Sequence, residues 1–123
     1  METREQVAQF LRDFRAAVTL GHVRWLQRSD QTKAHLSGLE ITRDQAVEYL
    51  LGLTPDNYSK GPAPDDFEPQ RDVWFFGCDV VGKEAYIKLA LQPDRRRRTV
   101  THAIIWAFHK AAYPMKYPLR ELP

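Results

Sequence analysis

Two alternating stretches in the last third of the chain carry the side chains best suited to acid–base chemistry. Tyr86 and Lys88 alternate with apolar residues over 84–91, and His109 closes the apolar stretch 99–109. Successive side chains of a strand point to opposite faces of a sheet. The core would take the large apolar side chains of both stretches: Ile87, Leu89, Trp106 and Phe108. Tyr86, Lys88 and His109 would then share the other face, and hairpin pairing would place Tyr86 opposite or diagonal to His109.

The connection between these two stretches contains four consecutive arginines: Arg95, Arg96, Arg97 and Arg98. They leave the end of the same hairpin, so we expect them near the same surface. A histidine, a phenol, a lysine and several guanidinium groups could then surround one phosphate.

This combination suits the cleavage of RNA without a metal ion. A base takes the proton of the 2′-hydroxyl, which attacks the neighbouring phosphorus, and an acid protonates the leaving 5′-oxygen. Cations stabilise the charge that grows on the non-bridging oxygens. An imidazole, whose ordinary pKa is about 6.5, can fill either proton-transfer role near neutral pH. RNA is the expected substrate because DNA lacks the internal nucleophile.

Each of these residues also has a plainer interpretation. His109 would be a surface residue at a strand end, Tyr86 and Lys88 a solvated sheet face, and the arginines a charged hairpin tip that discourages edge pairing. Metal-ligand spacing is missing among the other histidines and the single cysteine: His22, His35, His102 and Cys78. The sequence also lacks a glycine-rich phosphate loop and a nucleophile elbow, and it gives no sign of a cofactor.

The composition is that of an ordinary globular chain. Its 123 residues are 43% hydrophobic and 28% charged, which favours a single domain over residues 1–123. We expect a cytoplasmic protein without membrane contact, because no stretch has the length of a membrane span, no signal peptide is recognisable and Cys78 has no internal disulfide partner. Residues 1–81 hold 9 Lys and Arg against 13 Asp and Glu, whereas residues 82–123 hold 9 against 3. The basic last third is either an electrostatic footprint for a polyanion or a solubilising surface.

Two helices are predicted in the first half of the chain. Residues 3–18 place apolar side chains at helical spacing, with Thr3 and Gln6 as a capping box and Gly21 as the end. Residues 41–53 repeat the pattern, with Thr42 and Gln45 at the start.

The other segments are predicted to be strands, short elements and one long loop. Residues 22–26 suggest an edge strand with Val23 and Trp25 on one side, and residues 27–36 a short helix begun by Ser29 or Asp30. Residues 54–72, with four prolines and five acidic residues, predict a loop. A strand over 73–80 and the two alternating stretches complete an antiparallel meander. The fold class is therefore α+β, with the N-terminal helices on one face of a twisted antiparallel sheet.

From about Gly38 to Arg120, the chain resembles the MqsR family of toxin–antitoxin ribonucleases. The segments that carry the resemblance are, in order, "GLEITRDQAVEYLLGL", "DNYSKGP", "VWFFG", "EAYIKL" and "AFHKAAYPMKYPLR". The most specific are the Tyr-x-Lys-Gly-Pro segment, the Tyr-Ile-Lys strand and the final Phe-His with its Tyr-Pro tail. Residues 1–37 match only as a helical lead-in.

The resemblance implies a RelE-like fold and sequence-selective cleavage of mRNA. It also implies a co-expressed antitoxin, often a small protein with a zinc-binding domain and a helix-turn-helix domain. The family's functional positions fall on Lys60, Tyr86 and His109, with Lys60 swinging in from the long loop beside the phosphate. His109 would be general acid or base, Tyr86 its orienter or a second proton donor, Lys60 and Lys88 phosphate clamps, and the arginine run a docking surface.

Two positions depart from the family pattern. Phe75 stands where some members have glutamine, so base preference and rate do not carry over. His109 stands where those members have lysine, and it suits proton transfer better than a group with an ordinary pKa of about 10.4. Two alternatives stay open: an RNA- or protein-binding module of the same fold without turnover, and a basic tail whose main role is to dock an acidic antitoxin.

Overall fold

Both capping boxes expected from the sequence begin helices in the structure, a computed structural model that describes residues 2–26, 38–66 and 69–120. Helix α1 spans Arg4–Thr19, and the Thr3 hydroxyl accepts the Gln6 N–H while the Gln6 side chain accepts the Thr3 N–H. Helix α2 spans Arg43–Leu51 and is capped in the same way by Thr42. The short helix expected from Ser29 or Asp30 lies outside the described residues.

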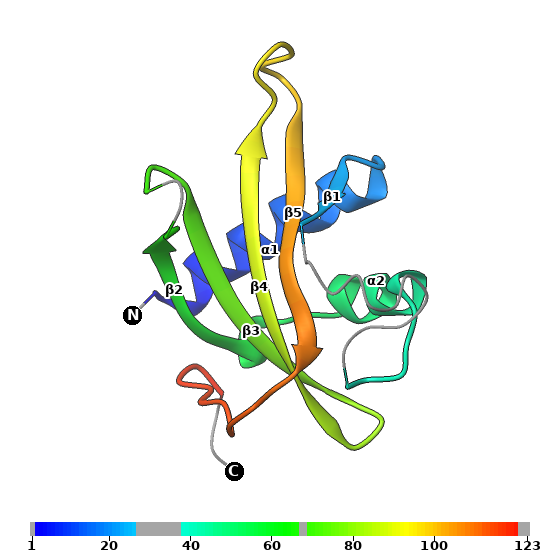
Figure 1. Ribbon diagram of the computed structural model, residues 1–123. Helices are drawn as coiled ribbons and strands as arrows, with labels where there is room; N and C mark the ends of the chain where they lie inside the picture. Colours follow the sequence, from blue (N-terminus) through cyan, green and yellow to red (C-terminus); the bar gives the residue numbers. More distant parts are fainter. Residues whose placement is uncertain (1, 27–37, 67–68, 121–123) are drawn as a thin grey trace.

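The helices pack on one face of a five-stranded sheet, so the α+β prediction is confirmed (Figure 1). The strands are β1 (Val23–Trp25), β2 (Tyr58–Pro64), β3 (Asp72–Val80), β4 (Lys83–Pro93) and β5 (Thr101–Lys110), in the order β1-β5-β4-β3-β2. Strand β1 lies at an edge, as predicted, but pairs parallel with β5. The sheet is therefore mixed, and the expectation of a fully antiparallel sheet is wrong. A three-residue strand carries no local signal of the direction in which a distant strand will run beside it.

The predicted loop over 54–72 is also wrong for its first part. A 3-10 helix (η1, Pro55–Asn57) leads into β2, which pairs antiparallel with β3. Strand β2 lies at the other edge of the sheet, where a proline, which lacks an N–H, does not interrupt a hydrogen-bond ladder. Gly61 has a φ of +114°, and a Cβ there would lie 2.8 Å from the Val73 carbonyl oxygen, so this close approach of two strands requires glycine.

The sheet has one covered face and one open face. The covered face packs against α1 and α2, and its core includes Phe10 and Phe14 of α1 with Phe76, Ile87 and Phe108 of the sheet. On the opposite side, which we call the open face, a smaller apolar cluster is formed by Val73, Phe75, Ala90 and Ile104, with Leu26, Ala63, Tyr86 and Trp106 packed against it.

A β-bulge in β5 separates the observed faces from the predicted ones. Lys88 pairs with Ala107 but Leu89 pairs with Ile105, so Trp106 is an extra residue in β5. Ile105 takes the covered face, and both Ile104 and Trp106 lie on the open face. The prediction that Trp106 faces the core with Phe108 is therefore wrong, because strict alternation fails across a bulge.

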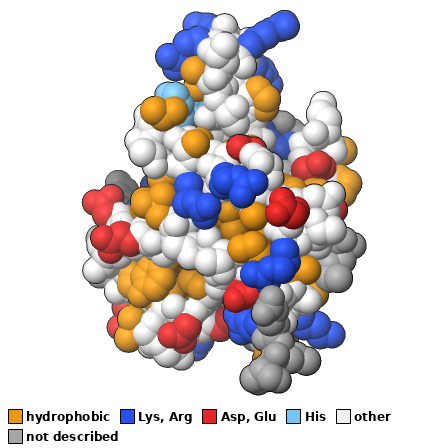
Figure 2. Space-filling model, turned by 180° about the vertical axis from the view of Figure 1, so that it is seen from behind, with side chains coloured by type: hydrophobic (Ala, Val, Ile, Leu, Met, Phe, Trp, Pro, Cys, Tyr) orange, Lys and Arg blue, Asp and Glu red, His pale blue; other side chains and the backbone are white. Residues whose placement is uncertain are grey.

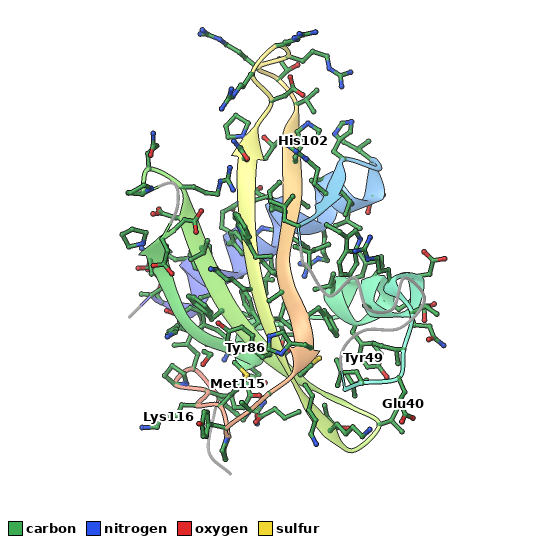
Figure 3. The ribbon with its side chains drawn as sticks, in the orientation of Figure 1. Glu40, Tyr49, Tyr86, His102, Met115 and Lys116 are labelled. Atoms are coloured by element: carbon green, nitrogen blue, oxygen red, sulfur yellow. The ribbon has the colours of Figure 1, made fainter. Side chains whose placement is uncertain are left out.

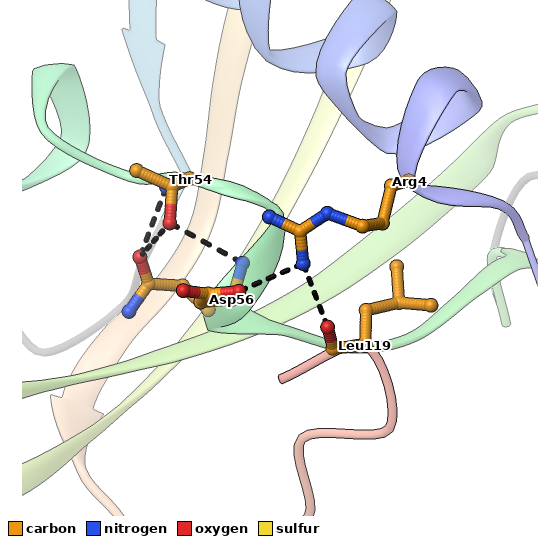
Figure 4. Close-up of polar contacts among 5 residues, drawn as sticks. Arg4, Thr54, Asp56 and Leu119 are labelled. Carbon is orange, nitrogen blue, oxygen red and sulfur yellow. Dashed lines mark hydrogen bonds and ion pairs between the residues drawn. The ribbon is translucent and has the colours of Figure 1, made fainter. Parts of the chain in front are cut away.

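The described C-terminal residues return to the start of α1. The Arg4 guanidinium donates to the Asp56 carboxylate at 2.8 Å and to the Leu119 carbonyl at 2.7 Å (Figure 4). One side chain thus joins the first turn of α1, η1 and the segment that follows β5.

Viewed from the helix side, acidic and basic side chains are intermixed over the body of the molecule, while basic side chains gather at the tip of the β4–β5 hairpin (Figure 2). Neither helix in the described part of the chain is long and apolar enough to cross a membrane.

Candidate functional site

The phenol of Tyr86 and the imidazole of His109 lie side by side on the open face. They are directly opposite in the β4–β5 ladder, and their rings stack with centroids 5.0 Å apart and planes inclined by 20°. Both side chains are partly exposed. The prediction that these two residues share one accessible surface is confirmed.

Local surroundings affect the pKa of the Tyr86 phenol and the tautomer of the His109 ring. A phenol is protonated at neutral pH, and burial raises the pKa of Tyr86 further above its ordinary value. His109 Nδ1 lies 2.9 Å from the Lys110 carbonyl oxygen. A carbonyl oxygen only accepts, so Nδ1 carries hydrogen and, in the neutral ring, Nε2 carries the lone pair.

Two lysines approach the same surface through the ring of Phe75. Lys60 Nζ lies 4.7 Å from the Phe75 centroid, and Lys88 Nζ lies 6.0 Å from it. Phe75 in turn contacts Tyr86, with centroids 5.9 Å apart. The two ammonium groups therefore border the stacked pair, held by cation–π contacts.

Lys60 reaches the open face because of an irregularity in β2. Tyr58 pairs with Phe76 and points into the core, whereas Lys60 pairs with Phe75, so the register shifts between them. In a regular strand, residues two apart share one face. The structure thus brings Lys60 beside the other predicted site residues, but from an edge strand and not from a swinging loop.

Trp106 belongs to this surface and was missed by sequence reasoning. Lys88 Nζ lies 5.4 Å from the Trp106 ring, and the Arg71 guanidinium lies 5.3 Å from the same ring. The sequence held one warning, because every residue from Ala103 to Phe108 is apolar. Without alternating polar residues, the pattern cannot show which of these side chains face the core.

The arginine run lies away from the stacked pair. Tyr86 and His102 lie towards opposite ends of the hairpin (Figure 3). His102 pairs with Gln92, six residues along β4 from Tyr86, which corresponds to about 20 Å at roughly 3.3 Å per residue. Arg95, Arg96, Arg97 and Arg98 lie beyond that point. The expectation that these arginines surround the same phosphate as Tyr86 and His109 is therefore wrong.

The C-terminal segment forms a wall next to the stacked pair. Glu84, two residues before Tyr86, accepts hydrogen bonds from the Met115 N–H at 3.0 Å and from the Tyr117 hydroxyl at 2.5 Å. Gly77, which pairs with Tyr86, lies beneath this segment: a Cβ at Gly77 would clash with the Tyr117 hydroxyl and approach Met115 Sδ to 2.7 Å. The Tyr-Pro tail noted in the sequence thus borders the candidate site.

No group of three or more histidine, cysteine, aspartate or glutamate side chains in residues 2–26, 38–66 and 69–120 is arranged to hold a metal ion. The described polar groups of this surface are the Tyr86 phenol, the His109 imidazole and the ammonium groups of Lys60 and Lys88, bordered by the Glu84 carboxylate with its Tyr117 partner. The phenol and the imidazole can exchange protons, and the ammonium groups can bind an anion. Comparisons of the whole chain with protein-family models, with curated proteins and with solved structures gave no match.

Proposed function

We propose that this protein is an endoribonuclease that cleaves single-stranded mRNA at the Tyr86–His109 pair, with the RelE-like fold and the toxin role that its resemblance to the MqsR family implies. The observation that carries the proposal is the stacking of the Tyr86 phenol on the His109 imidazole at a partly exposed site on the open face, near Lys60 and Lys88. In this proposal it acts in the cytoplasm and is silenced by a cognate antitoxin, which in the MqsR family often has a zinc-binding and a helix-turn-helix domain.

The reaction is an internal transesterification. The 2′-oxygen forms a bond to phosphorus and loses its proton to His109 Nε2, while the bond from phosphorus to the 5′-oxygen breaks and that oxygen takes the proton of the Tyr86 hydroxyl. Lys60 and Lys88 stabilise the charge on the non-bridging oxygens. The products are a 2′,3′-cyclic phosphate and a free 5′-hydroxyl, so the chemistry needs no group that the chain does not supply.

A non-catalytic RNA-binding module is the second candidate. The open face carries aromatic rings and two lysines, Lys60 and Lys88, that contact them. The rings are those of Phe75, Tyr86, Trp106 and His109. Aromatic platforms interleaved with cations bind single strands without cutting them. The two candidates therefore differ in turnover and not in ligand.

The test incubates the full chain with end-labelled RNA in the presence of a metal chelator and maps the cuts and their end groups. Cleavage with 2′,3′-cyclic phosphate ends is expected, and His109→Ala should lower its rate by about 10²- to 10⁴-fold with RNA affinity nearly unchanged. His22→Ala is the matched control, because His22 is also a partly exposed histidine but contacts His102 and not Tyr86.

A translating extract forms the second arm, so that cleavage restricted to ribosome-bound mRNA is also detected. Binding without cleavage in either arm would support the RNA-binding module and overturn the nuclease. Cleavage that survives His109→Ala would overturn the assignment of the site.

A further inference from the structure

A second basic surface lies at the far end of the open face from Tyr86. It is a groove of about 540 Å³ between β1 and the end of the β4–β5 hairpin. We call it the arginine groove, and its basic and aromatic lining is Arg24, Arg71, Arg95, Arg96, His102 and Trp106. Its volume is in the range of small-ligand sites.

The Asp94 carboxylate holds together the wall of the groove that the hairpin forms. Asp94 Oδ1 accepts the backbone N–H groups of Arg96 and Arg97 at 2.8 and 2.9 Å, and Asp94 Oδ2 lies 2.9 Å from His102 Nε2. The His102 hydrogen bond, followed by those two backbone bonds, lowers the pKa of Asp94 well below its ordinary range. Asp94 is the only acidic residue among the described lining residues, and its hydrogen bonds fix the backbone that carries Arg95 and Arg96.

Two ring nitrogens of the lining have no hydrogen-bond partner among the described residues. They are Trp106 Nε1, which can only donate, and His102 Nδ1. The other His102 nitrogen faces a carboxylate, so Nδ1 accepts in the neutral ring and donates in the imidazolium. The exposed guanidinium groups of the lining suit phosphate, because arginine matches its oxygens in a bidentate manner.

Trp106 connects this groove to the candidate site. The centre of its ring lies 5.4 Å from Lys88 Nζ, which belongs to the candidate site, and 5.3 Å from the Arg71 guanidinium carbon, which belongs to the groove. Arg24 also belongs to the open face, because its neighbours Val23 and Trp25 pack against the core. Cations and rings therefore continue along the open face from His109 to Arg95.

We propose that the arginine groove binds a backbone phosphate of the same RNA strand that is cut at Tyr86 and His109. This inference rests on the proposed function and extends it: the enzyme would hold RNA about 20 Å from the scissile bond. At the 3.4 Å per-strand rise of a stacked helix this is roughly six nucleotides, and fewer if the strand is extended.

The test measures binding of a labelled 12-nucleotide RNA by fluorescence anisotropy over a range of salt, in a His109→Ala background so that the RNA stays intact. Arg95→Ala/Arg96→Ala should weaken binding about tenfold, with a salt slope shallower by about 0.7 for each phosphate that the protein no longer neutralises. The matched control is Arg97→Ala/Arg98→Ala, which removes the same charge from exposed neighbours that do not line the groove. It should weaken binding less than threefold and leave the slope unchanged. Arg24 is exposed on the opposite wall of the groove. Arg24→Ala should therefore behave like Arg95→Ala/Arg96→Ala, which we call the groove pair.

The outcomes separate the two proposals. Equal affinities for the groove pair and its control, or no RNA binding at all, would overturn the groove whether or not the wild-type protein cuts RNA. Groove-dependent binding by a wild-type protein that cuts no RNA would keep the groove and overturn the nuclease. With both proposals correct, Arg95→Ala/Arg96→Ala in the active protein raises KM for the 12-nucleotide RNA while kcat stays within about twofold.

Discussion

The hydroxyl-bearing ring of Tyr86 is held by contacts that do not involve its hydroxyl. It stacks on His109 at 5.0 Å and lies against Phe75 at 5.9 Å, between centroids. The ring would keep both contacts without its oxygen. The position of the phenol and its chemistry can therefore be separated by mutation.

Tyr86→Phe should abolish most cleavage without unfolding the protein. The rate of RNA cleavage should fall by at least about 10²-fold, since the substitution removes a proton donor and no packing. Single-turnover cleavage and a thermal melt of the same samples measure both properties. Tyr113→Phe, at a phenol that is 82% exposed, is the control and should match the wild type. Cleavage within threefold of the wild-type rate would show that Tyr86 is not the acid.

Val81→Asn should stabilise the protein. Val81 and Gly82, between β3 and β4, have φ values of +50° and +82°, as in a type I′ turn, which favours Asn-Gly. A β-branched side chain is strained there, and Val81 is 81% exposed, so its removal exposes no core. We expect a gain of about 1 kcal/mol in the free energy of unfolding, measured in urea. Val81→Thr keeps the branching and should show no gain; equal stability of the two variants would contradict the explanation.

The contact between Tyr117 and Glu84 should weaken in alkali. Burial, followed by the hydrogen bond to Glu84 and its charge, raises the pKa of Tyr117 above its ordinary value of about 10. The contact contributes stability while the phenol is protonated, so the contribution is complete below about pH 10 and is lost as the pH rises through the higher folded value. The stability difference between wild type and Tyr117→Phe should be constant from neutral pH to about pH 9 and shrink above pH 10. A difference that does not change with pH would contradict the contact.

Arg4→Ala should loosen the segment that follows β5. The side chain is partly exposed, so its ion pair with Asp56 contributes about 1 kcal/mol or less. Loss of its bond to the Leu119 carbonyl should nevertheless make residues near 119 exchange their amide hydrogens faster. Arg12→Ala is the control, because Arg12 hydrogen-bonds to Gln9 within the same helix. Unchanged exchange in Arg4→Ala would show that the tail is held by other contacts.

The parts of the fold that sequence reasoning predicted correctly are those set by local contacts. The helix starts at Thr3 and Thr42 depend on side chains three residues apart. The Tyr86–His109 pair depends on the pairing of one hairpin, and the prediction that the two residues are opposite or diagonal holds although the bulge lies between them and the arginine connection.

The missed features depend on irregular pairing between strands. Register shifts turn Lys60 and Trp106 onto the open face. The local sequence around Lys60 does not show its shift, and the apolar run around Trp106 shows only that the two faces of that strand cannot be told apart by alternation. The same holds for the arginine groove, which joins Arg24 of β1 to the hairpin end through a parallel pairing between strands far apart in the chain. Bulges are frequent beside active sites because they redirect side chains.

The edges of the sheet restrict how another protein can bind. Pro62 and Pro64 of β2 have no N–H to donate, and the register of β2 is interrupted twice. Strand β1, at the other edge, has three residues. Within the described residues, neither edge supplies the long, regular row of backbone groups on which an incoming peptide could build an additional strand. A protein that binds at these two described edges would therefore have to recognise side chains more than backbone.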